Sequence, residues 1–257
     1  MHVILGGFIV VGTFLLALQY KSMEFNGFLN VYSAILLGGV PIGLMIVTYR
    51  FSTLWKALRG LFGSMAYNPD RERDRLAENL LAFGREVRRD RGVAASNILE
   101  SESDPVFQRL GRHVLEGTSI EEIETDAVIL GRQEMEDFGR ADKVLSSLGD
   151  FAPAMGMIGT VIGLIQLLVH MNDFEKLGPG MAIALLTTFY GLILGHLLYL
   201  PLARLVRDQG EQRTENINLV IEGMLKLARR RPLNEIRDVM GVSRGDNGEA
   251  ARQRAAE

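Results

Sequence analysis

The chain has 257 residues, of which 47% are hydrophobic and 23% are charged, and its formal net charge is −3. It contains no cysteine, which excludes disulfides, thiolate metal sites and cysteine nucleophiles. A slightly negative chain has no bulk attraction to phosphate backbones, so we expect no nucleic-acid partner.

The charged residues are distributed very unevenly along the chain. Four apolar runs contain no Asp, Glu, Lys or Arg at all: residues 3–20, 27–49, 151–172 and 177–203. Each run reaches or approaches the roughly 20 apolar residues that are needed to cross a hydrocarbon core about 30 Å thick. The sequence therefore predicts an all-α, polytopic membrane protein with four transmembrane helices and a helical cytoplasmic domain.

This pattern divides the chain into four segments. They are a first transmembrane hairpin (1–49), a helical cytoplasmic domain (50–150), a second transmembrane hairpin (151–203), and a cytoplasmic helix with a disordered tail (204–257). The first run follows no basic segment and ends without a good cleavage site, so we interpret it as a retained span. The end of the chain is rich in Gly, Ala and charge, which is typical of disorder.

Basic residues near the ends of the runs predict the orientation. Six lie on the side that holds both termini and the middle segment: Arg50, Lys56, Arg59, Arg204, Arg207 and Arg213. The two short loops on the other side offer only Lys21 and Lys176. By the positive-inside rule, we expect both termini and residues 50–150 to be cytoplasmic.

The charged segments have the spacing of helices. Pro69 and Asp70 suit the first turn of a helix that continues with apolar residues at helical spacing to Val87. A further helix is expected from Val106 onward. The pair Ser119-x-x-Glu122 is a capping box for a helix that runs toward Asp142.

The spans contain no carboxylate, which is the first functional indication. An ion carrier that works alone usually needs an intramembrane acid to bind the ion, although such a group is costly in the membrane. Either this chain conducts nothing, or another chain supplies the ionisable group.

Small residues recur in the last two runs at the spacing that lets helices approach closely in lipid. They are Gly156, Gly159 and Gly163 in the third run and Gly191 and Gly195 in the fourth. Close helix packing alone would explain these glycines.

Three threonines are the hydroxyls of interest in these runs: Thr160, Thr187 and Thr188. Each could donate a hydrogen bond to its own helix, or line a wet path through the membrane.

Three motifs in order make the chain resemble a known family. They are D-x-x-P-A-x-G-M-I-G-T-x-x-G at residues 150–163, G-P-x-M-A-x-A-L-L-T-T-x-Y-G at 178–191, and L-P-L-A at 200–203. This pattern resembles the MotA/PomA family, the larger stator subunit of the bacterial flagellar motor. The resemblance covers both predicted membrane hairpins.

The resemblance implies a homopentamer in the bacterial inner membrane, around two copies of a MotB-like, single-span, peptidoglycan-binding subunit. An Asp in the partner's membrane helix would bind and release the ion, which answers the missing carboxylate. The transported ion is Na⁺ or H⁺, with no resident cofactor and no metal site. The cytoplasmic segments would push on a FliG-like rotor protein, and the chain would not be an enzyme.

The resemblance also assigns roles near the membrane. Pro153 and Pro201 match the family's functional prolines and Asp150 matches the acid before the third span, which implies conformational coupling to torque. A simple packing kink is the alternative for the prolines. Thr160 and Thr188 match channel-lining positions, and with Thr187 they form the expected ion path.

The residue at position 160 bears on the choice of ion. Sodium-type relatives carry Thr there, whereas proton-type relatives carry a small apolar residue. Because oxygen ligands suit a hard cation, the resemblance favours Na⁺.

The family's rotor-contact pattern is matched only in part. Arg89 lies three residues before Gly92, as in the family, but the Leu99-Glu100 pair comes about three residues late and Asn97 occupies the family's Glu position. Three extra residues are nearly one helical turn, so Glu100 could lie on a similar face. A solvated charged face is the alternative.

Other functions fit less well. TolQ/ExbB-like relatives have one span before the cytoplasmic segment rather than two, and a gliding-type energising unit of the same superfamily stays open. A substrate transporter would show internal repeats, which are absent. A non-conducting scaffold stays open. An enzyme is least favoured because no nucleophile–base pair is visible.

Overall fold

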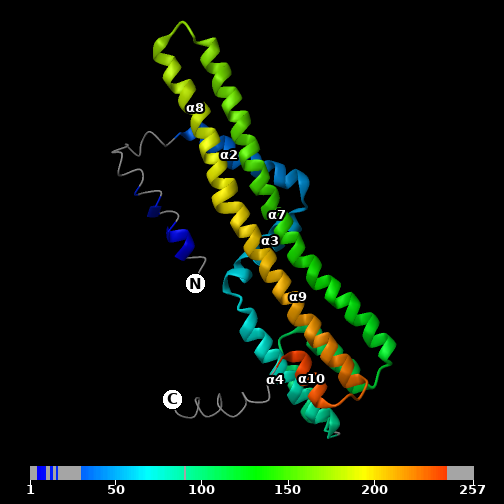
Figure 1. Ribbon diagram of the computed structural model, residues 1–257. Helices are drawn as coiled ribbons and strands as arrows, with labels where there is room; N and C mark the ends of the chain where they lie inside the picture. Colours follow the sequence, from blue (N-terminus) through cyan, green and yellow to red (C-terminus); the bar gives the residue numbers. More distant parts are fainter. Residues whose placement is uncertain (1–4, 10–11, 14–15, 17–29, 90, 242–257) are drawn as a thin grey trace. The chain divides into compact units, whose positions relative to one another are not determined.

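The computed structural model describes residues 5–9, 12–13, 16, 30–89 and 91–241. Within these residues all regular structure is helical (Figure 1), which confirms the prediction of an all-α chain. The principal helices are α2 (Val31–Thr48), α3 (Phe51–Ala66), α4 (Pro69–Arg88), α5 (Gly92–Ser101), α6 (Pro105–Glu116), α7 (Ile120–Val169), α8 (Phe174–Leu192), the π-helix η2 (Ile193–Tyr199), α9 (Leu200–Ala228) and α10 (Leu233–Met240). Most of the predicted first span (3–20) and of the predicted tail lies outside the described residues.

The chain forms two compact units. Unit 1 comprises residues 1–49 and 146–201, and unit 2 comprises residues 50–145 and 202–257. Among the described residues, three helical stretches are long and apolar enough to cross a membrane: Val31–Thr48, Ile120–Val169 and Leu177–Ala228.

Helix α7 is a single element of 50 residues. It begins as predicted, since the Ser119 hydroxyl accepts a hydrogen bond from the Glu122 N–H at 3.3 Å. It then continues through Asp150 and Pro153, so the predicted start of a span at residue 151 is not a helix boundary. Proline removes one backbone donor from a helix, and here this loss does not interrupt it.

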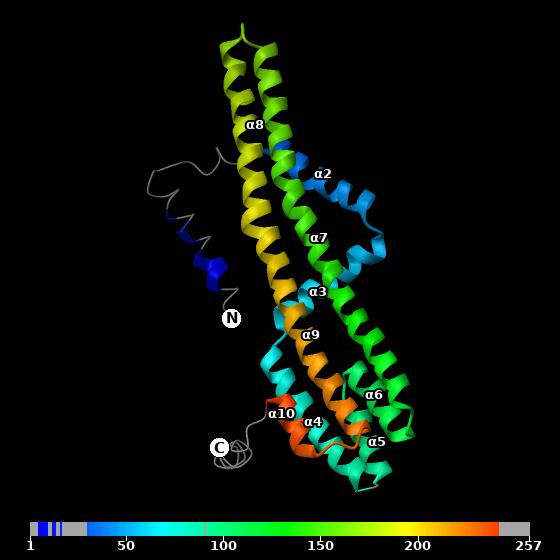
Figure 2. The ribbon, with the colours of Figure 1, turned by 45° about the vertical axis from the view of Figure 1, so that its right-hand side comes forward.

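In unit 1, α7 and α8 lie side by side in both views (Figures 1 and 2), and glycines set their separation. A Cβ atom added at Gly163 would lie 2.7 Å from the Ala184 nitrogen, and one at Gly191 would lie 2.7 Å from the Ala152 oxygen. Both distances are too short for a real side chain. The two backbones are therefore in direct contact, as small residues allow in lipid.

Hydrogen bonds fix both ends of α2 within unit 1. The Asn30 side chain caps the helix by accepting from the Ser33 N–H at 3.0 Å, while the Asn30 N–H donates to the Tyr190 hydroxyl at 3.3 Å. At the other end, the Tyr49 and Ser147 hydroxyls are 2.8 Å apart. Because lipid offers no alternative partners, such bonds favour one seating of the helix.

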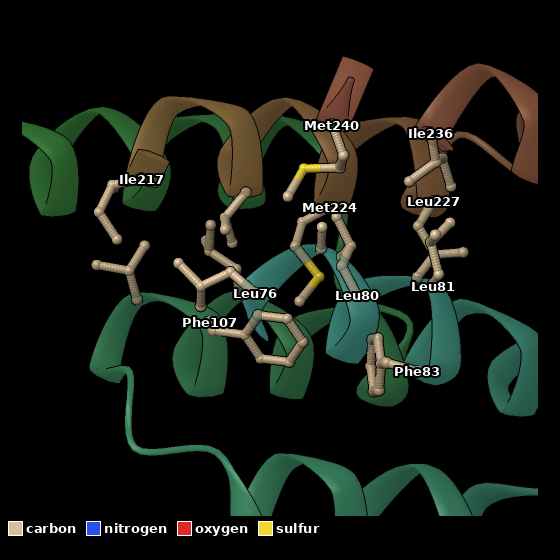
Figure 3. Close-up of a cluster of buried hydrophobic side chains, with 14 of the residues drawn as sticks. Leu76, Leu80, Leu81, Phe83, Phe107, Ile217, Met224, Leu227, Ile236 and Met240 are labelled. Carbon is tan, nitrogen blue, oxygen red and sulfur yellow. The ribbon is translucent and has the colours of Figure 1, made fainter. Parts of the chain in front are cut away.

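Unit 2 has a conventional hydrophobic core, drawn in Figure 3. Helix α4 begins at the predicted proline, and the Asn68 side chain caps it by accepting from the Arg71 N–H at 3.2 Å. Its buried face meets α6 and α9, and the Phe83 and Phe107 rings pack edge to face with centroids 6.0 Å apart. The largest fully buried side chains of this core are Phe83, Phe107, Leu76, Leu80, Leu110, Ile123, Ile217, Met224 and Ile236.

A buried ion cluster joins four helices of unit 2. The Arg213 guanidinium on α9 contacts Glu72 of α4 and Asp104 at the start of α6, and lies 3.8 Å from Glu134 of α7. The Arg213 side chain is only 11% exposed. Asp104 also caps α6 by accepting from the Phe107 N–H at 2.7 Å.

Glu102 extends this polar layer beside Asp104. Burial alone would raise the pKa of Glu102, but hydrogen bonds from Asn79 and from the Asp104 and Ser103 N–H groups, with Arg75 nearby, hold it below its usual value. The ionised Glu102 carboxylate therefore stabilises the fold at pH values above the ordinary pKa of a glutamate. This contribution to stability is lost as the pH falls from that value through the lower pKa of Glu102 in the folded chain.

The α7–α8 contact predicts that Gly159→Ala destabilises the chain. The added Cβ would lie 2.6 Å from Thr187 Cβ and Cγ2, and overpacking of this kind costs about 1–3 kcal/mol. Gly178→Ala is the matched control, because nothing lies within 4 Å of that position on α8. Thermal unfolding of the detergent-solubilised chain should show a lower Tm for the first variant only. Equal effects at both positions would contradict the packing argument.

The ion cluster predicts that Arg213→Met destabilises unit 2 by about 3–5 kcal/mol, since it leaves buried carboxylates without their cation. Arg132→Met is the control, because Arg132 is 80% exposed where it pairs with Glu136 and such pairs contribute about 0–1 kcal/mol. Loss of helical circular dichroism on heating measures both. An Arg213→Met variant with unchanged thermal stability would show that apolar packing can replace the ion cluster.

Candidate functional site

The threonine hydroxyls of α7 and α8 meet at the glycine-lined contact. Thr160 Oγ1 lies 3.1 Å from the Gly156 oxygen on its own helix and 3.1 Å from the Ala184 oxygen across the contact. It also pairs with the Thr188 hydroxyl, which itself lies 3.4 Å from the Gly156 oxygen. Both side chains are partly exposed in the single chain. Two hydroxyls and two carbonyl oxygens therefore cluster at one level of the helix pair.

Thr187 is placed differently from its neighbour. Its side chain is completely buried against Gly159, and its hydroxyl donates back to α8 at the Ile183 oxygen (2.9 Å) or the Ala184 oxygen (3.1 Å). A threonine that bonds to its own helix in this way fills space between helices. The structure therefore brings Thr160 and Thr188 together and leaves Thr187 inside the packing.

This arrangement can present oxygen ligands to a small cation. A hydroxyl has one proton and two lone pairs, so Thr160 and Thr188 can donate to a carbonyl and still accept. Hard cations such as Na⁺ are bound by oxygen atoms of this kind. No charged group is needed within the pair itself, in keeping with the absence of Asp, Glu, Lys and Arg from residues 151–172 and 177–203.

Pro153 lies against the π-helix η2, a feature that the sequence did not indicate. A Cβ atom added at Gly195 would lie 2.7 Å from both the Pro153 Cγ atom and the Gly149 oxygen. In η2 the Leu200 N–H donates to the Gly195 oxygen, one residue further back than in an α-helix. Pro201 follows immediately in α9 and supplies no N–H, so the backbone here has fewer hydrogen bonds than a regular helix.

The three residues expected to couple ion passage to torque therefore differ in setting. Pro153 is partly buried at the π-helix, whereas Asp150 and Pro201 are exposed in the single chain. Asp150 follows Gly149, whose carbonyl oxygen lies so near Gly195 that a Cβ atom added there would be 2.7 Å from it. A π-helix is a rare departure from α-helical geometry that occurs frequently at functional sites.

The two candidate rotor residues lie on adjacent helices of unit 2. Arg89 caps the end of α4, its side chain is 61% exposed, and its guanidinium is 3.5 Å from Glu86. Glu100 and Asn97 are both exposed on α5, three residues apart and hence on neighbouring positions of one face. Figure 2 shows α4 and α5 following one another at the same end of unit 2.

No cluster of three or more His, Asp or Glu side chains suited to a metal ion occurs among the residues that the structure describes.

Comparison with known proteins adds independent information. Residues 98–218 match the model of the MotA/TolQ/ExbB proton channel family. Motility protein A of Treponema pallidum is 30% identical over 225 residues, which cover 79% of this chain and 84% of that protein. Chemotaxis protein PomA of Vibrio alginolyticus is 45% identical over 84 residues, a third of each chain.

The fold is also found among solved structures. The flagellar MotAB stator complex from Bacillus subtilis contains a chain that superimposes with a TM-score of 0.80 at 20% identity, covering 98% of both chains. The likeness therefore extends over the whole architecture, and the sequence match to Treponema pallidum extends over most of it. The predicted family is confirmed, as is the prediction that the chain is no enzyme. The chain belongs to the MotA/TolQ/ExbB proton channel family, whose members are channel proteins of the membrane.

Proposed function

We propose that this chain is the MotA-like stator subunit of an ion-driven rotary motor that turns a flagellar rotor. The observation that carries the proposal is the Thr160–Thr188 hydroxyl pair, which lies at a glycine-lined helix contact with no acid in either span. Relatives named for motility, among them the Treponema pallidum protein, support the motor branch of the family.

The missing carboxylate supports a partner chain. A MotB-like subunit with one membrane helix and an Asp would complete the path, because burying a charged Asp is costly and binding H⁺ or Na⁺ neutralises it. The solved Bacillus subtilis complex contains MotA with MotB. We propose the same pairing here, with five copies of this chain around two of the partner.

Exposed apolar surface on the spans supports assembly in a membrane. Large side chains on α2, α7 and α8 stay uncovered in the single chain, among them Val31, Ile35, Val47, Val161, Leu168, Val169 and Leu185. Only 22% of the apolar window of α2 is buried. We propose that the chain has four spans in the inner membrane of a bacterium, and that residues 151–203 form the second transmembrane hairpin. Both termini and the domain at residues 50–150 would lie on the cytoplasmic side.

For the ion we propose Na⁺ rather than H⁺, with Thr160 and Thr188 as ligands. A proton needs no ligand shell, whereas Na⁺ loses water oxygens on entry and must replace them. Thr187 is not included among the ligands, because its side chain has no exposed surface and its hydroxyl is bound to its own helix.

We propose that the π-helix transmits ion passage to unit 2. Neutralisation of a partner Asp would shift α8 against α7, and the segment between Gly195 and Pro201, poor in hydrogen bonds, would absorb the change. Arg89 and Glu100 would then meet charges of the opposite sign on a FliG-like rotor protein.

The proposal predicts that Thr160→Ala folds and assembles but loses most Na⁺-dependent motility, while Thr160→Ser keeps much of it by retaining the hydroxyl. Thr48→Ala is the matched control, because the Thr48 hydroxyl donates to its own helix, at the Leu44 oxygen (2.7 Å). We expect this substitution to leave motility unchanged. The measurement is swimming speed against external Na⁺ at fixed pH. A wild-type speed that ignores Na⁺ and collapses with a protonophore would make the chain a proton-type stator.

Rotor contact predicts that Arg89→Glu lowers torque without changing membrane insertion or ion flux, since Arg89 is exposed and outside the spans. Glu100→Arg should act in the same direction, and more strongly than Asn97→Arg. Arg132→Glu, on the exposed face of α7, serves as the control for charge reversal. Tethered-cell rotation reports torque. Unaltered torque in Arg89→Glu would contradict a rotor contact and show that Arg89 belongs to a solvated charged face.

A further inference from the structure

His196 is the one histidine that lies well inside an apolar run of the sequence. It belongs to the run 177–203, whereas His170 lies near the end of the run 151–172. The His196 side chain is exposed in the single chain, on the π-helix η2. Ionisable side chains are costly inside a membrane, and those that occur there almost always face a water-filled cavity or the interior of a bundle. The position of His196 therefore points to a function.

The hydrogen bonding of η2 decides which way His196 points. In a regular α-helix, residues 187 and 195 are eight positions apart and point about 80° away from each other. In η2 the Leu200 N–H donates to the Gly195 oxygen, so each turn holds one residue more than a turn of α-helix. Positions seven apart in a regular helix differ by only about 20°. The wider turns of η2 therefore bring Gly195 back toward the side of the helix on which Thr187 lies.

Contacts with α7 agree with this orientation. Thr187 and Gly195 both pack directly against α7, although they are eight residues apart. Thr188 follows Thr187 and lies at the edge of the helix contact, where it pairs with the Thr160 hydroxyl. His196 follows Gly195 in the same way. It therefore lies on the Thr188 side of the helix pair, eight residues or about 12 Å further along.

Few charged or titratable groups surround η2 within unit 1. On α7, Asp150 is the only charged residue between positions 146 and 169, and it adjoins the Gly149 that meets η2. The π-helix itself carries Tyr199, and Tyr49 after α2 pairs with Ser147 of α7. A phenol is ordinarily uncharged between pH 5 and 8 and a carboxylate is ordinarily charged, so histidine is the side chain whose charge changes in this range.

Protonation changes what an imidazole offers to a passing cation. A neutral imidazole presents a nitrogen lone pair to the cation or to its water, whereas an imidazolium has no free lone pair and carries a positive charge. Like charges repel strongly where the surroundings have a low dielectric constant. A protonated histidine beside an ion path in a membrane therefore opposes the passage of cations.

We propose that His196 is a further residue of the ion path, which lets cations pass while it is neutral and opposes them when it is protonated from the cytoplasmic side. It lies eight residues from Thr188 and eight from Arg204, the first charged residue after it in the chain. The inference rests on the proposed function, since it requires a cation path along Thr160 and Thr188. It does not depend on whether the cation is Na⁺ or H⁺.

The test is the rotation speed of tethered cells while a permeant weak acid lowers the cytoplasmic pH from about 7.5 to about 6, at fixed external pH and Na⁺. The wild-type speed should fall several-fold across this range. Each variant is compared with its own speed at the higher pH. His196→Gln cannot take up a proton and should lose most of this fall. His196→Arg is always charged and should rotate slowly throughout.

Two other histidines provide matched controls. His170→Gln removes an exposed imidazole just after α7, where Nδ1 lies 2.9 Å from the Gln166 oxygen. His113→Gln removes an imidazole of unit 2 that lies 2.9 Å from Asp126. Both variants should keep the wild-type dependence on cytoplasmic pH. Equal amounts of each variant in the membrane, and its co-purification with the MotB-like partner, show that it assembles.

Three results would overturn the role of His196. They are a wild-type speed that does not depend on cytoplasmic pH, an unchanged pH dependence in His196→Gln, and wild-type speed in His196→Arg. In each case the cells rotate, so the proposed stator function stands. If His196→Arg is missing from the membrane, the comparison of the wild type with His196→Gln decides. Cells that fail to rotate with the wild-type chain at every pH would overturn the stator function and the role of His196 together.

Discussion

Direct backbone contact between α7 and α8 is the constraint on which the membrane part of the structure depends. Lipid provides no hydrophobic force between helices, so their association depends on close packing and hydrogen bonds. The glycines at 156, 159, 163 and 191 bring the backbones together, and only at this separation can the Thr160 hydroxyl reach the Ala184 oxygen of the other helix. A larger residue at these positions would remove both the contact and the oxygen cluster.

Unit 2 is held together by different forces, because it buries a core of Phe, Leu, Ile and Met side chains and a charged cluster around Arg213. A buried ion pair contributes little net stability, yet breaking it is costly. Because Arg213 contacts carboxylates on both α4 and α6, a shift of α9 against either helix would separate buried charges, while the hydrophobic core supplies most of the favourable free energy of folding.

Much of this architecture could be predicted from local sequence, and the remainder depends on contacts that sequence alone does not specify. The helix start at Pro69 and the Ser119 cap were predictable because each involves residues within one turn. Arg213 counted as a basic residue near a span, but the structure surrounds it with carboxylates brought together from distant segments. The continuity of α7 from Ile120 to Val169 is not visible in the composition, because a change from charged to apolar residues does not interrupt backbone hydrogen bonding.

Thr187 and Thr188 show why adjacent residues of one type acquire different roles. Neighbouring positions on a helix point about 100° apart, so one threonine is turned into the packing and the other toward Thr160. The buried Thr187 donates its hydroxyl hydrogen to its own helix, while the Thr188 hydroxyl keeps lone pairs accessible at the edge of the contact. Two adjacent threonines thus serve a close-packed helix pair that also presents accessible oxygen atoms. A rigid pair of helices that is to present oxygen ligands without burying a charge needs both the close packing and the accessible oxygens.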